Sequence, residues 1–273
     1  MNVEVYGCNH GPWVQAVLLG LHDKGIEYQL RSTPPREALI RWGVYMPAIS
    51  IDNEPWAIES SEILVKLGFE PISTEDMKAI RRTYQGVLHR ADKPLHFIAG
   101  WARAGDSSTG FFQRSGRNFL RSFIPFYMFT RLNLIKQIMK PVDPENFGDQ
   151  YLFWENKLEA SSEEFFDGDK PGIRDFQLFG IIQCHASIPV PPLESLMNDE
   201  RLANMRRWIA CMHERFSDYP NLYSGSYFEP RRPQPVSASL VQRLMFYLGL
   251  MTMILALPIT LPLAFVLMQK VPS

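Results

Sequence analysis

The first part of the chain alternates between short apolar stretches and amphipathic ones. Val3–Tyr6 alternates in the manner of a strand, and apolar residues then recur at helical spacing from Trp13 to Lys24. A further strand is expected at Glu27–Arg31 and a short helix at Arg36–Trp42. These patterns predict a strand–helix–strand unit at the start of the chain, followed by a short helix.

Residues 44–64 predict two short strands and the start of a helix. Ala48–Ile51 and Trp56–Ile58 are expected as strands around a tight turn, with Ser60 as the N-cap of the next helix. Pro47 opens the first of these strands, where a missing N–H is tolerated. A cis peptide bond between Met46 and Pro47 would leave the N–H and C=O of Met46 free for the backbone of an extended ligand.

Glu59 and Ser60 stand together at the junction between the second strand and the helix. The first N–H groups of a helix and its dipole favour a bound carboxylate, while Glu59 can pair with a ligand ammonium. Together the two residues can hold both charged ends of an amino acid. The alternative is that Ser60 only caps its helix and Glu59 is solvated.

The remaining pattern is mostly helical up to residue 223, with one unusual segment at residues 107–142. This segment combines basic and aromatic residues without a single acidic one, and Arg114, Arg117 and Arg121 share one helical face. A basic amphipathic stretch with aromatics fits the surface of an anionic bilayer. The alternative is an ordinary helix hairpin with a solvated basic face. No nucleic-acid-binding motif accompanies the charge, so we expect no nucleic acid partner.

The C-terminal part predicts a linker and a membrane anchor. Residues 224–239 are rich in Pro, Ser and Gly, and Leu244–Met268 contains no charged residue. That length is enough to cross about 30 Å of hydrocarbon, so residues 240–269 are predicted to form a single transmembrane helix. More basic residues precede this helix than follow it, so the globular part is expected on the cytoplasmic side.

Composition adds few constraints. The chain has 273 residues, 46% of them hydrophobic and 21% charged, which fits one or two globular domains. Its net charge of −1 does not favour binding to nucleic acid. Three cysteines without paired spacing predict free thiols in a reducing compartment and no metal site. The N-terminus lacks the pattern of a secretory signal.

Two segments carry a resemblance to a known family. Residues 3–68, with Met46-Pro47 and Glu59-Ser60, resemble the thioredoxin-like N-terminal domain of soluble glutathione transferases, and Phe166–Gly180, with Asp175, resembles the signature of their helical domain. The resemblance implies a thioredoxin-like α/β domain at residues 1–70 and an all-α domain at residues 75–223. It also implies that Met46, Pro47, Glu59 and Ser60 bind glutathione, and that the protein is a homodimer.

The expected catalytic loop departs from the family pattern, because Gly11 stands where related enzymes often carry Ser or Cys. Cys8 and His10 are the candidate catalytic residues, Cys8 through a mixed disulfide and His10 as a donor or a positive charge. Tyr6 is expected to be buried. His89, His96, Phe97 and Trp101 follow in the helical part, either as the pocket for an electrophilic substrate or as core residues.

Three functions remain open at this point. The first is a membrane-anchored enzyme that conjugates glutathione to a hydrophobic electrophile, or performs thiol–disulfide chemistry if Cys8 is the nucleophile. The second is a non-catalytic, membrane-anchored scaffold of the same fold, and the third is a protein whose main work is lipid binding by residues 107–142. The anchored architecture is similar to that of the ganglioside-induced differentiation-associated proteins.

Overall fold

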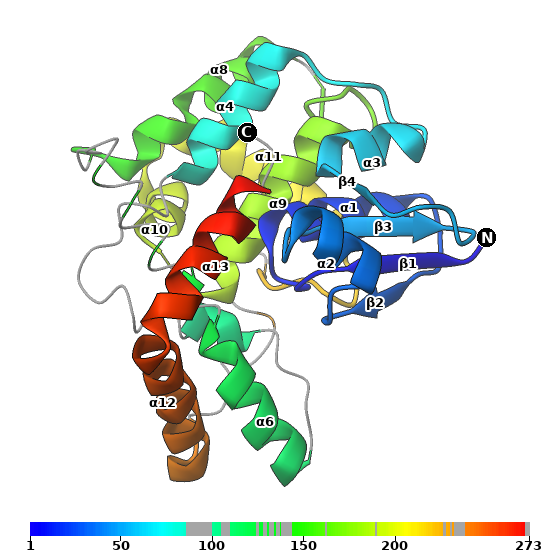
Figure 1. Cartoon of the computed structure of the whole chain (residues 1–273). Coiled ribbons are helices and arrows are strands. Elements are labelled where there is room, and N and C mark those ends of the chain that lie inside the picture. Colours follow the sequence, from blue (N-terminus) through cyan, green and yellow to red (C-terminus); the bar gives the residue numbers. More distant parts are fainter. Residues whose placement is uncertain are drawn as a thin grey trace.

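The computed structural model describes residues 1–85, 100–104, 110–123, 126–127, 130, 134, 137, 144–161, 163–188, 190–225, 228–229, 231 and 238–270 (Figure 1). A small sheet with its helices forms one side of the molecule, and the helical part forms the other. The pocket candidates His89, His96 and Phe97 lie outside the described residues, as does much of the stretch at 107–142.

The sheet has four strands in the order β2-β1-β3-β4. Its strands are β1 (Val3–Tyr6), β2 (Gln29–Arg31), β3 (Ala48–Ile51) and β4 (Ala57–Ile58). The first two are parallel and are joined by helix α1 (Pro12–Asp23), whereas β3 runs antiparallel to both of its neighbours. The predicted strand–helix–strand unit is confirmed, and β2 begins two positions later than expected.

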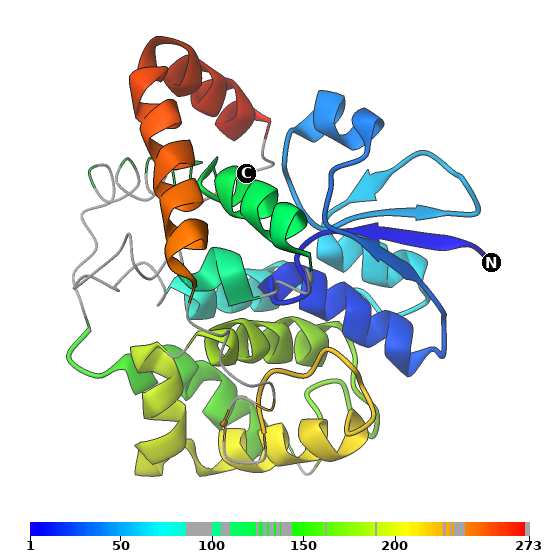
Figure 2. The same ribbon diagram turned by 90° about the horizontal axis from the view of Figure 1, so that it is seen from below.

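Successive residues of the strands face opposite sides of the sheet. Val5 and Ile49 pack into the large core with α1 and α3 (Ser60–Lys66). Tyr6 and Ala48 instead pack under α2 (Arg36–Trp42), so the sheet lies between α2 and the other two helices (Figure 2). This order of strands and helices is that of the predicted thioredoxin-like domain.

The helical part contains eight described elements before the tail. These are α4 (Thr74–Gln85), α6 (Phe111–Arg121), the 3-10 helix η2 (Phe147–Tyr151), α8 (Leu152–Ala160), α9 (Ile173–Ser187), α10 (Pro191–Asn198) and α11 (Ala203–Arg215), with a short 3-10 turn η3 (Glu200–Leu202) before the last. Helix α9 is buried along nearly its whole length and packs on α1. At their contact Gly180 approaches the α1 backbone so closely that a Cβ would lie 3.2 Å from the Ala16 nitrogen. This contact joins the two domains into one core.

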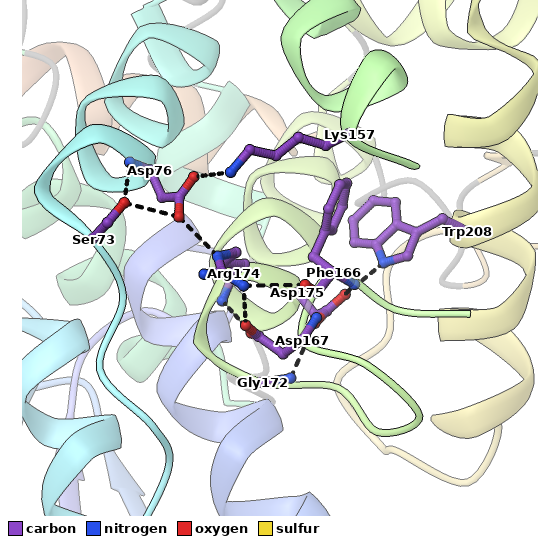
Figure 3. Close-up of polar contacts among 9 residues, drawn as sticks. All are labelled: Ser73, Asp76, Lys157, Phe166, Asp167, Gly172, Arg174, Asp175 and Trp208. Carbon is purple, nitrogen blue, oxygen red and sulfur yellow. Dashed lines mark hydrogen bonds and ion pairs between the residues drawn. The ribbon is translucent and has the colours of Figure 1, made fainter. Parts of the chain in front are cut away.

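The start of α9 is held by two aspartates (Figure 3). The Asp175 carboxylate accepts N–H bonds from Gly172 at 3.0 Å and Phe166 at 2.9 Å, as the sequence predicted for this residue. Gly172 has no side chain to complete the cap, and Asp167 fills that place by accepting the Arg174 N–H at 3.1 Å. The helix start therefore keeps two acceptors although the expected hydroxyl is missing.

The C-terminal segment is two helices rather than the single helix predicted. Helix α12 (Leu240–Leu255) and helix α13 (Leu257–Gln269) meet at an angle of 91°. The break falls just before Pro258, which has no N–H and whose ring would clash with the carbonyl of Ile254 in a continuous helix. Among the described residues no single helix is long and apolar enough to cross a membrane, although the bent pair meets that criterion by length and composition.

Both tail helices pack against the globular part of the protein. Helix α12 lies beside α6 at one end of the molecule (Figures 1 and 2), where a Cβ on Gly249 would sit 2.6 Å from the Phe119 carbonyl oxygen. At the end of α13, the Lys270 ammonium donates to the Ile40 carbonyl at 2.9 Å. The tail is thus packed along the globular part at both of its helices.

Candidate functional site

The sheet brings the three predicted site segments to one end. Its register aligns Tyr6 with Ala48 and Ala48 with Ile58 in a single row across β1, β3 and β4. Directly beyond this row lie the loop that follows Tyr6, the Met46–Pro47 pair and the Glu59–Ser60 pair. Residues that are far apart in sequence therefore share one edge of the domain, as a binding site requires.

Met46 has an unpaired backbone at this edge. The Met46–Pro47 bond is cis, and among the described residues the Met46 N–H and C=O make no hydrogen bond. If the β3–β4 register were continued, Met46 would stand across from Ser60, but pairing stops at Pro47 because proline offers no N–H. The backbone of Met46 is thus available to an extended peptide ligand.

Glu59 is held in an unusual conformation between β4 and α3. Its φ is 70°, and its carboxylate accepts the Tyr45 hydroxyl at 2.6 Å. A non-glycine residue in this region carries a cost of order 1–3 kcal/mol, and such residues cluster at functional sites. Tyr45 fixes one carboxylate oxygen, which orients a half-buried negative charge at the sheet edge. The sequence carries no signal for this contact, because it depends on how the two turns fold together.

Ser60 is the first residue of α3, and Glu59 occupies the N-cap position that the sequence assigned to Ser60. The reason is that Glu59 has a positive φ, which is not helical. The last non-helical residue is therefore Glu59 and not Ser60. Ser60 is only 7% exposed, and its hydroxyl accepts a hydrogen bond from Gln177 on α9 at 3.3 Å. Ser60 therefore makes no side-chain cap and instead connects the candidate site to the buried helix of the second domain.

The two catalytic candidates lie in the loop before α1, but neither is charged near neutral pH. Cys8 is half-buried, and burial raises the pKa of its thiol to about 11, with Arg121 acting in the opposite direction. Burial lowers the pKa of His10 to about 4, which favours the neutral ring, so of the two roles expected for His10 that of a hydrogen-bond donor is favoured over that of a positive charge. Tyr6 is buried as expected, and burial raises its pKa far above the ordinary value for a phenol.

His10 is packed among aromatic rings rather than open to a ligand. Its imidazole centroid lies 4.6 Å from that of Trp101, and among the described residues neither ring nitrogen has a hydrogen bond of ordinary geometry. Trp101 was one of the predicted pocket residues, and it is the one that the structure describes. His10 itself is only 2% exposed.

The same loop is tied to the end of the helical part. The Tyr223 hydroxyl donates to the Asn9 side chain at 2.8 Å, and the Gln15 amide donates to the Asn221 carbonyl at 2.9 Å. The Tyr219 hydroxyl in turn donates to the other end of the Gln15 amide at 3.1 Å. These contacts join residues about two hundred positions apart and hold the loop rigid next to the candidate site.

In the part of the chain that the structure describes, no metal site accompanies these groups. Within the described ranges, no three His, Cys, Asp or Glu side chains are grouped closely enough to hold an ion. All three cysteines carry free thiols. The candidate site is therefore a sheet edge with an unpaired backbone segment at Met46, one acidic side chain and one hydroxyl, next to the loop of Cys8 and His10.

The chain has distant similarity to several solved glutathione S-transferase structures. No protein-family model and no curated protein matches the sequence. The Tau class glutathione S-transferase from mango, Mangifera indica, is 16% identical with a TM-score of 0.43, over 90% of this chain and 96% of its own. The glutathione S-transferase of Ascaris lumbricoides is 13% identical with a TM-score of 0.44, over 81% and 94% of the two chains.

A third structure, glutathione S-transferase-I bound with lactoylglutathione, is 13% identical with a TM-score of 0.40, over 81% of this chain and 98% of its own. At these identities the likeness concerns the fold alone. The fold assignment for this chain rests on its own strand order, register and helix arrangement, which match a thioredoxin-like domain followed by a helical domain.

Proposed function

We propose that this protein is a glutathione transferase-like protein that binds glutathione at the edge formed by Met46, Pro47, Glu59 and Ser60. The observation that carries the proposal is the meeting of an unpaired backbone at Met46 with an oriented carboxylate at Glu59. The backbone of Met46 pairs with the cysteinyl part of the tripeptide in the manner of an added strand. Glu59 binds the ammonium of the γ-glutamyl part, and Ser60 with the first N–H groups of α3 binds its carboxylate.

The reaction that we propose is conjugation of glutathione to a hydrophobic electrophile. In this scheme the glutathione thiol points toward the loop of Cys8, His10 and Gly11. Because burial keeps the Cys8 thiol protonated and His10 neutral, Cys8 is a poor nucleophile and His10 acts at most as a neutral hydrogen-bond partner. Conjugation is therefore favoured over thiol–disulfide chemistry through Cys8.

The second candidate function is a non-catalytic scaffold that keeps the ligand-binding edge. It is supported by the same loop, in which Gly11 has no side chain and the two titratable groups are uncharged. Measurement of catalytic turnover distinguishes the enzyme from the scaffold. Conjugation of a standard aryl halide well above the uncatalysed rate would exclude the scaffold, and the absence of turnover despite tight glutathione binding would support it.

We further propose that the protein works at a membrane as a homodimer, with its globular part on the cytoplasmic side. The supporting observation is the apolar tail, whose two helices pass the length and composition criterion together. The homodimer is proposed because the sequence resembles soluble glutathione transferases. Membrane lipid is then a partner beside glutathione and the electrophile.

Calorimetric titration of reduced glutathione into the full chain tests the binding edge. Glu59→Gln keeps the shape and the acceptor for Tyr45 but removes the charge, so we expect an affinity loss of about tenfold or more. Ser60→Ala should weaken binding several-fold. Glu54→Gln makes the same chemical change at an exposed position of the adjacent turn and should bind like the wild type. No heat of binding at millimolar glutathione would refute the proposal.

A further inference from the structure

The last turn of α13 lies against the end of α2. Leu267 is so close to Gly43 that a Cβ on the glycine would be 2.6 Å from the Leu267 Cδ2 atom. Just beyond, the Lys270 ammonium donates to the Ile40 carbonyl at 2.9 Å. Figures 1 and 2 show the end of α13 directed toward the sheet domain. We name these two contacts, of Leu267 with Gly43 and of Lys270 with Ile40, the tail brace.

The end of α2 needs partners of this kind. The last carbonyl groups of a helix have no donor within the helix, and a positive charge near them is favourable. The Leu39 carbonyl accepts the N–H of Gly43. The next carbonyl, that of Ile40, accepts from Lys270, which lies 230 positions further along the chain. Gly43 has a φ of 70° and no Cβ, so Leu267 can pack directly on its backbone.

The segment that begins at Gly43 leads into the proposed glutathione edge. Residues 43–47 belong to no helix or strand, so the elements at their two ends determine where they lie. Within this segment the Tyr45 hydroxyl donates to Glu59 at 2.6 Å. Met46, the next residue, presents the backbone groups that make no hydrogen bond among the described residues. A shift at Gly43 therefore moves both the residue that orients Glu59 and the backbone that meets the ligand.

The tail brace is small enough to act on this segment without holding the domain together. It consists of one leucine contact and one hydrogen bond from a half-buried lysine. Much of α13 faces solvent, because its large residues Leu257, Ile259, Leu261, Leu263, Phe265 and Val266 are each between 39% and 72% exposed. The core of the sheet domain is formed instead by Val5, Ile49 and the residues around them. Losing the brace should therefore loosen the end of α2 locally and leave the domain folded.

We propose that Leu267 and Lys270 are positioning residues that hold residues 43–46 in place and, through them, the glutathione edge. The inference rests on the proposed function and adds the end of the tail to its binding site. With the brace in place, Tyr45 and Met46 already lie where the ligand needs them, so glutathione binds without first ordering the segment. Loss of the brace leaves the edge looser and lowers the affinity for glutathione.

The first test is calorimetric titration of reduced glutathione into full-length variants. Lys270→Met removes the donor to Ile40, and Leu267→Ala removes the side chain that covers Gly43. Each should weaken binding about two- to tenfold, because the affinity can change by no more than the contact itself contributes. Lys270→Arg keeps a charged donor and should restore the wild-type affinity.

Two control variants make the same chemical changes away from α2. Lys66→Met removes a positive charge at an exposed position of α3, in the same domain, and so measures the effect of charge alone. Leu255→Ala truncates a leucine that is 77% exposed on α12. Both controls should bind glutathione like the wild type. Wild-type affinity in Lys270→Met and Leu267→Ala, or equal losses in the controls, would overturn the proposal.

The second test is hydrogen exchange of the same variants, which needs no ligand and distinguishes positioning from a general structural role. In Lys270→Met and Leu267→Ala, the amides of residues 39–46 should exchange faster than in the wild type. The amides of β1 (Val3–Tyr6) should exchange as in the wild type. Unchanged exchange at residues 39–46, or faster exchange in both segments, would overturn the proposal.

Exchange also separates the fate of the brace from that of the proposed function. If the wild type binds no glutathione while residues 39–46 exchange faster in both variants, the proposed function is refuted and the brace is supported. In a wild type that binds glutathione, the ligand should in turn slow exchange in the last turn of α13, because coupling between two sites is reciprocal. No such slowing would overturn the proposal.

Discussion

Asp175→Asn should destabilise the helical domain strongly, because the carboxylate faces four N–H donors. Its Oδ1 atom accepts from the Phe166 N–H at 2.9 Å and the Trp208 indole at 2.7 Å. Its Oδ2 atom accepts from the Gly172 N–H at 3.0 Å and the Asp167 N–H at 3.2 Å. Asparagine keeps one of the two oxygens and places an NH₂ group at the other. In either orientation of the amide, two of the four N–H donors face the NH₂ group, which cannot accept their hydrogen bonds.

The magnitude follows from those two donors. Each buried N–H that loses its acceptor costs about 1–3 kcal/mol, so we expect the free energy of unfolding to fall by roughly 4 kcal/mol. The side chain is fully buried, and burial raises the pKa of Asp175 to about 7. Urea unfolding is therefore compared at pH 8, where the carboxylate is ionised, with tryptophan fluorescence as the signal.

The matched control is Asp169→Asn, the same chemical change at an exposed position of the same loop. Its free energy of unfolding should stay within about 0.5 kcal/mol of the wild type. A loss below about 1 kcal/mol for Asp175→Asn, or equal losses in both variants, would refute the reasoning. Such a result would mean that the donors at the start of α9 find other acceptors.

Three more predictions follow from the packing and the site. Gly180→Ala should lower the free energy of unfolding, measured in urea, by about 1–3 kcal/mol, because the added Cβ would meet the α1 backbone. The control Gly116→Ala adds its Cβ in open space and should not lower the free energy of unfolding. Equal effects of the two substitutions would contradict the close contact at Gly180. Tyr45→Phe should weaken glutathione binding several-fold in calorimetry by releasing Glu59, and unchanged affinity would show that this bond does not orient the carboxylate. Burial lowers the pKa of His10, His185 and His213 to about 4, 3 and 4, so the unfolded state takes up protons first as pH falls. The stability that these histidines contribute should then be fully present above pH 6.5 and fall toward pH 4 by about 1.4 kcal/mol per unit for each histidine. Asp175, whose pKa burial raises to about 7, opposes this fall with the slope of one group only, so the net stability still decreases. A urea midpoint unchanged from pH 7 to 5 would contradict this.

The local pattern of the chain was enough to predict most of the sheet domain. Alternation and helical spacing predicted β1, β3 and α2 at their observed bounds, because these signals come from neighbours within one element. The Asp175 cap was also predictable, since a helix start is a local feature. By the same logic the sequence placed Met46–Pro47 and Glu59–Ser60 at element boundaries, and the sheet register then brought them together.

What the tertiary structure decided depends on contacts between distant segments. Burial beside Trp101 lowers the pKa of His10, Tyr45 orients Glu59, and Asp167 takes the place of a missing hydroxyl at the start of α9. The apolar tail predicted a single span by length, but Pro258 broke it and Gly249 allowed α12 to pack on α6. Composition and spacing report how apolar a segment is. Only packing determines which of its sides meets protein and which is left for another partner, because that choice depends on surfaces built from residues far away in the chain.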